Sequence, residues 1–182
     1  MNQQHPALVA TQKWLEDIVI GLNFCPFAKK EFINGTIHYE ISTAGQLDKA
    51  LEVIAEQCQK LMENDDIETT LVIYSLGFRR FEQYLDLVEY ANDLLIEFGF
   101  EGDIQIASFH PDYVFDGEDE HSPSHYTNRS PYPTIHLIRE ASMEKVLSVY
   151  KDPELIPENN IALTEEKGAA FFRQYLAKIK KM

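Results

Sequence analysis

The fold class follows from residues 71–109, which read LVIYSLGFRRFEQYLDLVEYANDLLIEFGFEGDIQIASF. The first four residues are apolar on both faces of an extended chain, as in a central strand of a parallel sheet. From about Phe81, apolar residues recur at helical spacing until Gly99, which is placed to end the helix; they are Leu85, Val88, Ala91, Leu95 and Phe98. Residues 104–109 then predict another strand. The order strand, helix, strand indicates a parallel crossover and therefore an α/β protein.

The alternation of strands and helices continues on both sides of this stretch. Upstream, residues 36–41 alternate apolar and polar side chains, which predicts a strand with one solvated face. Helices are expected from Pro6 and behind Thr43, which begins a capping-box pattern. Downstream, residues 134–138 predict a fourth strand, and Thr164 is expected to begin a final helix.

These elements predict a single α/β domain that spans residues 1–182. We expect a mainly parallel four-stranded sheet with helices on its faces. Because a loop, and no helix, leads to the fourth strand, we expect this last strand to run antiparallel. A chain of this length can bury a core without disulfides or a structural metal, and we find no repeat or linker that would indicate a second domain.

Composition and charge narrow the class of partners and the compartment. The chain has 16 Lys and Arg against 30 Asp and Glu, a formal charge of −14. Such a charge repels polyanions, so we expect neither nucleic acid nor a membrane surface as a partner. The N-terminal residues lack the pattern of a secretory signal, and no apolar run approaches the roughly 20 residues that span a bilayer. Two cysteines form no disulfide framework, which favours a cytoplasmic protein.

One connection breaks the regular pattern. Residues 110–133 read HPDYVFDGEDEHSPSHYTNRSPYP, 24 residues without convincing periodicity. Connections of this length are uncommon in compact domains and are usually functional or disordered. Four prolines stiffen this one, which favours a long ordered functional loop. Its two ends are expected at the carboxyl edge of the sheet, where ligands bind in open α/β folds.

Three residues are candidates for catalysis. His110 leaves the third strand and could act as a general base that Asp112 orients. Cys25 precedes Pro26, so it could stand at a helix start, where backbone N–H groups stabilise a thiolate nucleophile. The alternatives are structural: His110 could cap backbone groups at the loop entrance, and Cys25 could be a small buried hydrophobe.

The end of the loop supplies the candidate ligand-binding groups. Arg129 can recognise a carboxylate or phosphate through its planar fork. Amide, hydroxyl and phenol groups that could line the same site belong to Asn128, Ser130, Tyr113 and Tyr132. Alternatively, Arg129 clamps the acidic middle of the loop. Residues 79–80, two arginines ahead of a helix, call for a nearby anion or for surface acids as partners.

Metal and cofactor patterns are weak. Asp112 matches the first position of a calcium loop, but Val114 and Pro123 fill positions where acidic ligands are required. His121 and His125 have a spacing seen in zinc sites, but Pro123 forbids the helix that would align them. No phosphate loop, nucleophile elbow or dinucleotide fingerprint occurs, so we expect neither a metal nor a cofactor.

Four motifs together carry a resemblance to a known family. They are CPFA (25–28), ASFHPDY (107–113), TNRSPYP (127–133) and HLIRE (136–140), behind Trp14 in the first helix. In this order they resemble the uncharacterised bacterial domain-of-unknown-function family fourteen-fifteen over nearly the whole chain. The resemblance implies a cytosolic bacterial protein and brings no established activity.

Two functions follow from these residues. The first is a site for a small anionic molecule at the carboxyl edge of the sheet. This site could also be an active site whose reaction depends on His110 and Cys25. The second is a non-catalytic adaptor that docks another protein through residues 110–133. The sequence is compatible with both an enzyme and a binding protein.

Overall fold

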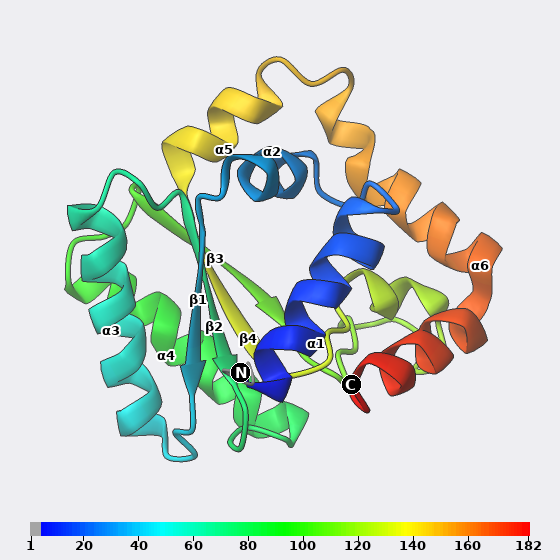
Figure 1. Ribbon diagram of the computed structural model, residues 1–182, viewed down its shortest axis with the longest axis horizontal. Coiled ribbons are helices and arrows are strands. Elements are labelled where there is room, and N and C mark those ends of the chain that lie inside the picture. The colour runs from blue at the N-terminus through cyan, green and yellow to red at the C-terminus, as the bar shows by residue number, and fades with distance from the viewer. Residues whose placement is uncertain (1–4) are drawn as a thin grey trace.

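The computed structural model describes residues 5–182, which form one four-stranded sheet with helices on both faces (Figure 1). The predicted domain of residues 1–182 also includes residues 1–4, which lie outside the described part. The strands are β1 (Ile37–Ser42), β2 (Thr69–Tyr74), β3 (Ile104–Phe109) and β4 (Thr134–Arg139). The helical elements are α1 (Pro6–Trp14), η1 (Leu15–Ile20), α2 (Pro26–Asn34), α3 (Leu47–Glu63), α4 (Phe81–Glu97), η2 (Pro123–Thr127), α5 (Glu140–Leu147), η3 (Pro153–Leu155) and α6 (Ile156–Ile179).

The sheet is mixed, with the order β1-β2-β4-β3, and the expectation of a mainly parallel sheet is wrong. Only β1 and β2 pair in parallel, whereas β4 pairs antiparallel with both β2 and β3. The last strand therefore runs antiparallel, as expected, but it inserts between its neighbours instead of adding at an edge. Burial explains the central position of β4. Ile135 and Leu137 are buried on one face of the strand and Ile138 on the other, as a central strand requires.

Two apolar clusters hold the helices to the two faces of the sheet. On one face, α3 and α4 bury side chains such as Ile54, Leu61 and Leu87 against β2 and β4. On the other face, α1, η1 and α6 bury Trp14 and Phe172, among others, against β1 and β2. Each fully buried side chain of this size stabilises the fold by ~1.5–3 kcal/mol.

The helix starts agree only in part with the sequence patterns. Pro6 is the first residue of α1, and the Nδ1 of His5 accepts a hydrogen bond of 3.1 Å from the N–H of Ala7. The capping box expected at Thr43 does not form, since α3 has Gln46 as its N-cap and no side-chain cap. The final helix starts at Ile156, earlier than predicted.

Helix α6 is interrupted at Gly168, whose φ of 75° and ψ of 152° are not helical. This conformation is open to glycine and strained for other residues. The kink divides α6 into two segments, and the second packs over η2 and the loop of residues 110–133 (Figure 1). It therefore carries Arg173 and Lys180 toward the edge of the sheet where the loop begins.

The turn after β2 is tightly held at this same edge. A Cβ on Gly77 would lie 2.0 Å from the carbonyl oxygen of Ala44, so only glycine fits there. The next residue, Phe78, has a φ of 54°, in the left-handed region that costs a bulky residue about 1 kcal/mol or more. The strained turn sets the direction in which Arg79 leaves the sheet. In residues 5–182, no helix is both long and apolar enough to cross a membrane.

Candidate functional site

Two adjoining cavities lie at the carboxyl edge of the sheet, of about 340 Å³ and about 360 Å³. Pro111, Asp112, Pro131 and Lys180 line both of them. The smaller cavity reaches the end of β2, and the larger one extends toward the second segment of α6. Their volumes are at the lower end of the range of small-molecule sites.

The charges around these cavities are mostly positive. Four cationic side chains line them, those of Arg79, Arg129, Arg173 and Lys180, against the single carboxylate of Asp112. Within residues 5–182 none of the four takes part in an ion pair, whereas the neighbouring Arg80 lies 3.7 Å from Glu82. In a chain with a net charge of −14, this is a local excess of positive charge.

Lys180 shows the effect of this environment. Partial burial lowers the pKa of Lys180, Asp112 opposes the shift, and the charge of Arg79 adds to it. The ammonium nitrogen also lies 5.4 Å from the ring centroid of Tyr132, which lines the smaller cavity. Lys180 therefore interacts electrostatically with the charges of Arg79 and Asp112 and with the ring of Tyr132.

Arg129 is held in place by contacts that leave part of its guanidinium group free. Its Nε donates a hydrogen bond of 2.9 Å to the carbonyl oxygen of Tyr113, and the guanidinium carbon lies 4.8 Å from the ring centroid of Tyr126. In the described part of the chain, no hydrogen bond or ion pair involves its two terminal nitrogens. The alternative of a clamp on the acidic residues of the loop is not what the structure shows.

His110 is fully buried and lies beside the cavities, not in their lining. Its Nε2 lies 2.9 Å from the carbonyl oxygen of Phe78, and its Nδ1 accepts a hydrogen bond of 3.0 Å from the N–H of Asp112. These partners place the proton on Nε2. Burial lowers the pKa of His110, which favours the neutral form of the ring. Both ring nitrogens therefore have hydrogen-bond partners within the protein. In this arrangement His110 holds the backbone of Phe78 and Asp112 in place.

The structure does not bring Cys25 to His110. The ring of His110 packs against Phe81 and Tyr84 of α4, with ring centroids 5.2 and 5.1 Å away. Cys25 is the N-cap of α2, as predicted, but it packs in the cluster on the opposite face of the sheet. Burial raises the pKa of its thiol, and the backbone groups of Ala28 and Phe27 oppose this only in part.

Three of the candidate ligand-binding residues fasten the loop. The side-chain Nδ2 of Asn128 donates to the carbonyl oxygen of Ser108 (3.1 Å), and the main-chain carbonyl oxygen of Asn128 accepts from the N–H of His110 (3.1 Å). The hydroxyl of Ser130 donates to the carbonyl oxygen of Tyr132 (2.7 Å). Tyr113 is half-buried, with its ring 5.2 Å from that of Phe81.

Arg173 and Lys180 were not predicted as site residues. The available signal was Gly168, since a glycine inside an otherwise helical pattern marks a change of direction.

The other loop histidines play no part at these cavities. His125 is buried, with its Nδ1 accepting from the N–H of Phe115 (3.3 Å) and its Nε2 lying 2.8 Å from the carbonyl oxygen of Asp119. His121 is exposed. In residues 5–182 no three His, Cys, Asp or Glu side chains are grouped so that they could hold a metal ion.

Comparison with known proteins gives a family and no activity. A family model described as "Protein of unknown function (DUF1415)" matches residues 7–174, nearly the whole chain. Searches of curated proteins and of solved structures find no match. The chain belongs to the DUF1415 family of proteins of unknown function.

Proposed function

We propose that this protein binds a small anionic molecule, through its carboxylate or phosphate group, at the carboxyl edge of the sheet. One observation carries the proposal: Arg79, Arg129, Arg173 and Lys180 surround two adjoining cavities, and none of them is paired with an acid in the described part of the chain. An acidic protein has many carboxylates with which to neutralise surface arginines. Four cations that stay unpaired around a hollow favour an external anion as their partner.

The repulsion among these cations supports the same conclusion. Arg79 contributes to the lowered pKa of Lys180, so each of the two charges disfavours the other. A bound anion would remove this unfavourable energy and would raise the pKa of Lys180. The binding energy would therefore come from relief of existing repulsion as well as from new hydrogen bonds.

The geometry of Arg129 suits recognition of an oxyanion. Its Nε is fixed on Tyr113 and its flat face lies on Tyr126, so little side-chain entropy would be lost on binding. The free terminal nitrogens can offer two parallel N–H groups to a carboxylate or phosphate. Pro111 and Pro131 stiffen the wall between the two cavities. We propose binding at this site and assign no reaction step to it.

The adaptor hypothesis has less support from the loop. It relies on exposed tyrosines as anchors, but Tyr126 is 5% exposed and stacks on Phe172 with a centroid distance of 5.1 Å. Tyr113 and Tyr132 are half-buried. The continuous exposed stretch of the loop is its acidic tip, residues 116–121, which lacks the apolar anchors of typical interfaces.

The test is calorimetric titration with inorganic phosphate, pyrophosphate and succinate at low salt. We expect at least one of them to bind saturably, with affinity falling as salt rises. Arg79→Met and Arg129→Met should each weaken binding by about tenfold, equivalent to ~1.4 kcal/mol. Arg80→Met is the matched control, because Arg80 is adjacent and exposed but does not line either cavity. The proposal fails if no anion binds, or if Arg80→Met weakens binding as much as Arg79→Met.

A further inference from the structure

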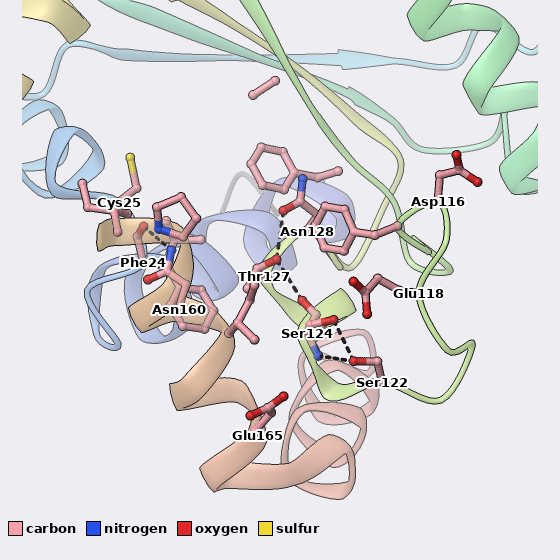
Figure 2. A pocket seen from close by; sticks show the side chains of 17 residues that line it. Phe24, Cys25, Asp116, Glu118, Ser122, Ser124, Thr127, Asn128, Asn160 and Glu165 are labelled. Atoms are coloured by element: carbon pink, nitrogen blue, oxygen red, sulfur yellow. Dashed lines mark hydrogen bonds between the residues drawn. The ribbon is translucent and has the colours of Figure 1, made fainter. Parts of the chain in front are cut away.

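A third cavity shares no lining residue with the two cationic ones and lies between η1, β3, the loop of residues 110–133 and the first segment of α6 (Figure 2). Its volume is about 680 Å³, in the middle of the range of small-molecule sites. Apolar side chains make up much of its lining, namely the rings of Phe24, Phe109 and Phe115 and the aliphatic side chains of Ile156 and Ile161. A lining of this kind favours a ligand with a hydrocarbon body.

The charges at this cavity are all negative. Asp116 and Glu118 come from the loop and Glu165 from α6, and the lining contains no lysine or arginine (Figure 2). Among residues 5–182 no basic side chain pairs with any of the three carboxylates. The two sites therefore have opposite electrostatic character.

The neutral polar groups of the lining are already used by the protein. Asn160 Nδ2 donates to the carbonyl oxygen of Phe24 (2.8 Å), and Thr127 Oγ1 donates to the carbonyl oxygen of Ser124 (2.9 Å). The hydroxyls of Ser122 and Ser124 lie 2.7 Å apart. These donors are therefore bonded within the protein, and the carboxylates are the charged groups that a ligand meets here.

We propose that this cavity binds a small organic cation, an amine with an apolar body. Its hydrocarbon part would lie against the phenylalanine rings, and its ammonium group would lie near the carboxylate of Glu118 or Glu165. Asp116, whose side chain points away from the other lining residues in Figure 2, would add negative charge at longer range. Aromatic rings attract cations as well, so the phenylalanines and the carboxylates of the lining favour the same ligand class. This site is independent of the proposed anion site, and either can fail without the other.

The protein contains a built-in reporter for this cavity. Trp14 is the single tryptophan, and its ring packs edge-on against Phe109, with centroids 5.2 Å apart at 68°. Cys25 also lines the cavity, so a bound ligand should shield its thiol. Tryptophan fluorescence and the rate of Cys25 alkylation by iodoacetamide are thus two separate readouts of binding, the second in a Cys58→Ser background.

The experiment compares three molecules of nearly the same shape: 3-phenylpropylammonium, 3-phenylpropanol and 3-phenylpropanoate. We expect the ammonium to bind saturably, to slow Cys25 alkylation, and to bind at least about tenfold more tightly than the alcohol, with the carboxylate weakest. Both residues are exposed, so Glu118→Gln and Glu165→Gln should each weaken ammonium binding by up to about fivefold, as expected for an exposed ion pair. Glu120→Gln and Glu166→Gln are matched controls, because both residues are exposed neighbours outside the cavity lining.

Three results would overturn the proposal. The first is the absence of saturable ammonium binding in both readouts. The second is equal or tighter binding of the alcohol or the carboxylate, which would make the cavity a site for a neutral or anionic apolar ligand. The third is a pair of Glu→Gln variants at positions 118 and 165 that bind as tightly as the controls at positions 120 and 166.

Discussion

The Nε2 of His110 lies 2.9 Å from the carbonyl oxygen of Phe78, the residue with a left-handed φ of 54°. This hydrogen bond joins the end of β3 to the strained turn after β2. Arg79 follows directly in that turn and lines the smaller cavity at the carboxyl edge. His110 therefore fixes the place of a cationic side chain through the turn that carries it.

Replacement of His110 by alanine should destabilise the fold and weaken anion binding together. The change leaves a void beside Tyr84 and removes the partners of the Phe78 carbonyl and the Asp112 N–H. The expected loss of unfolding free energy is ~2–4 kcal/mol. Urea unfolding measures it, with His121→Ala, an exposed loop histidine, as the control that should change little. A His110→Ala protein of wild-type stability would show that the hydrogen bond does not hold the turn.

Gly168→Ala should impair anion binding through the course of α6. Alanine disfavours the φ of 75° at this position, so the second helical segment should shift, and Arg173 and Lys180 with it. We expect a loss of ~1–2 kcal/mol in stability and about tenfold in anion affinity. Gly35→Ala is the control, since Gly35 has a φ of 72° at the C-cap of α2, away from the cavities. Equal anion affinity in the two variants would contradict the role assigned to the kink.

Acid should destabilise the protein through His136. Burial lowers the pKa of His136 to about 4, below its value of 6.5 in the unfolded chain. Between these values the unfolded state binds more protons, so the stability that His136 contributes is present above pH 6.5 and lost as the pH falls toward 4. The wild type should lose ~2–3 kcal/mol over this window from this group.

The test for His136 is urea unfolding at several pH values, in wild type and in His136→Gln. The variant should show a flatter dependence between pH 6.5 and 4, while His121→Gln should follow the wild type. Parallel curves for wild type and His136→Gln would mean that the proton uptake belongs to other groups.

Cys25 should react slowly with alkylating reagents at neutral pH. Burial raises the pKa of its thiol, so the thiolate fraction is small. Alkylation of the Cys58→Ser protein across pH 7–10 measures this, and the profile should not move when His110 is replaced by alanine, because the two residues lie on opposite faces of the sheet. A thiolate that forms below pH 8 and depends on His110 would restore the thiol–imidazole hypothesis.

The periodicity of residues 71–109 predicted the strands and the helix between them well. The structure has β2 at Thr69–Tyr74, α4 at Phe81–Glu97 and β3 at Ile104–Phe109. The order of the strands could not be predicted in the same way, because alternation records which faces are buried and not which strand is adjacent. The apolar character of both faces of β4 was the one local indication that it lies inside the sheet.

The site was predictable where it depends on the loop and not where it depends on α6. Asp112, Arg129 and Tyr132 all line the cavities at the carboxyl edge, close to the residues that the sequence marks as unusual. Lys180 joins them because α6 changes direction at Gly168. The glycine was a local sign of a break, but the place that the second segment reaches depends on its packing against η2, which no local pattern records. The hydrogen bonding of the His110 ring could not be predicted from the sequence either, because its Nε2 partner is a carbonyl group 32 positions away.

The most direct test of the anion site is the pKa of Lys180, measured by NMR of the labelled lysine side chains with and without pyrophosphate. Lys180→Gln identifies its signal. The account predicts a pKa below 10.5 in the free protein, because partial burial and Arg79 disfavour the charge, and a higher pKa once pyrophosphate is bound. A Lys180 pKa that is the same at zero and at high pyrophosphate would contradict the claim that an anion binds among these cations.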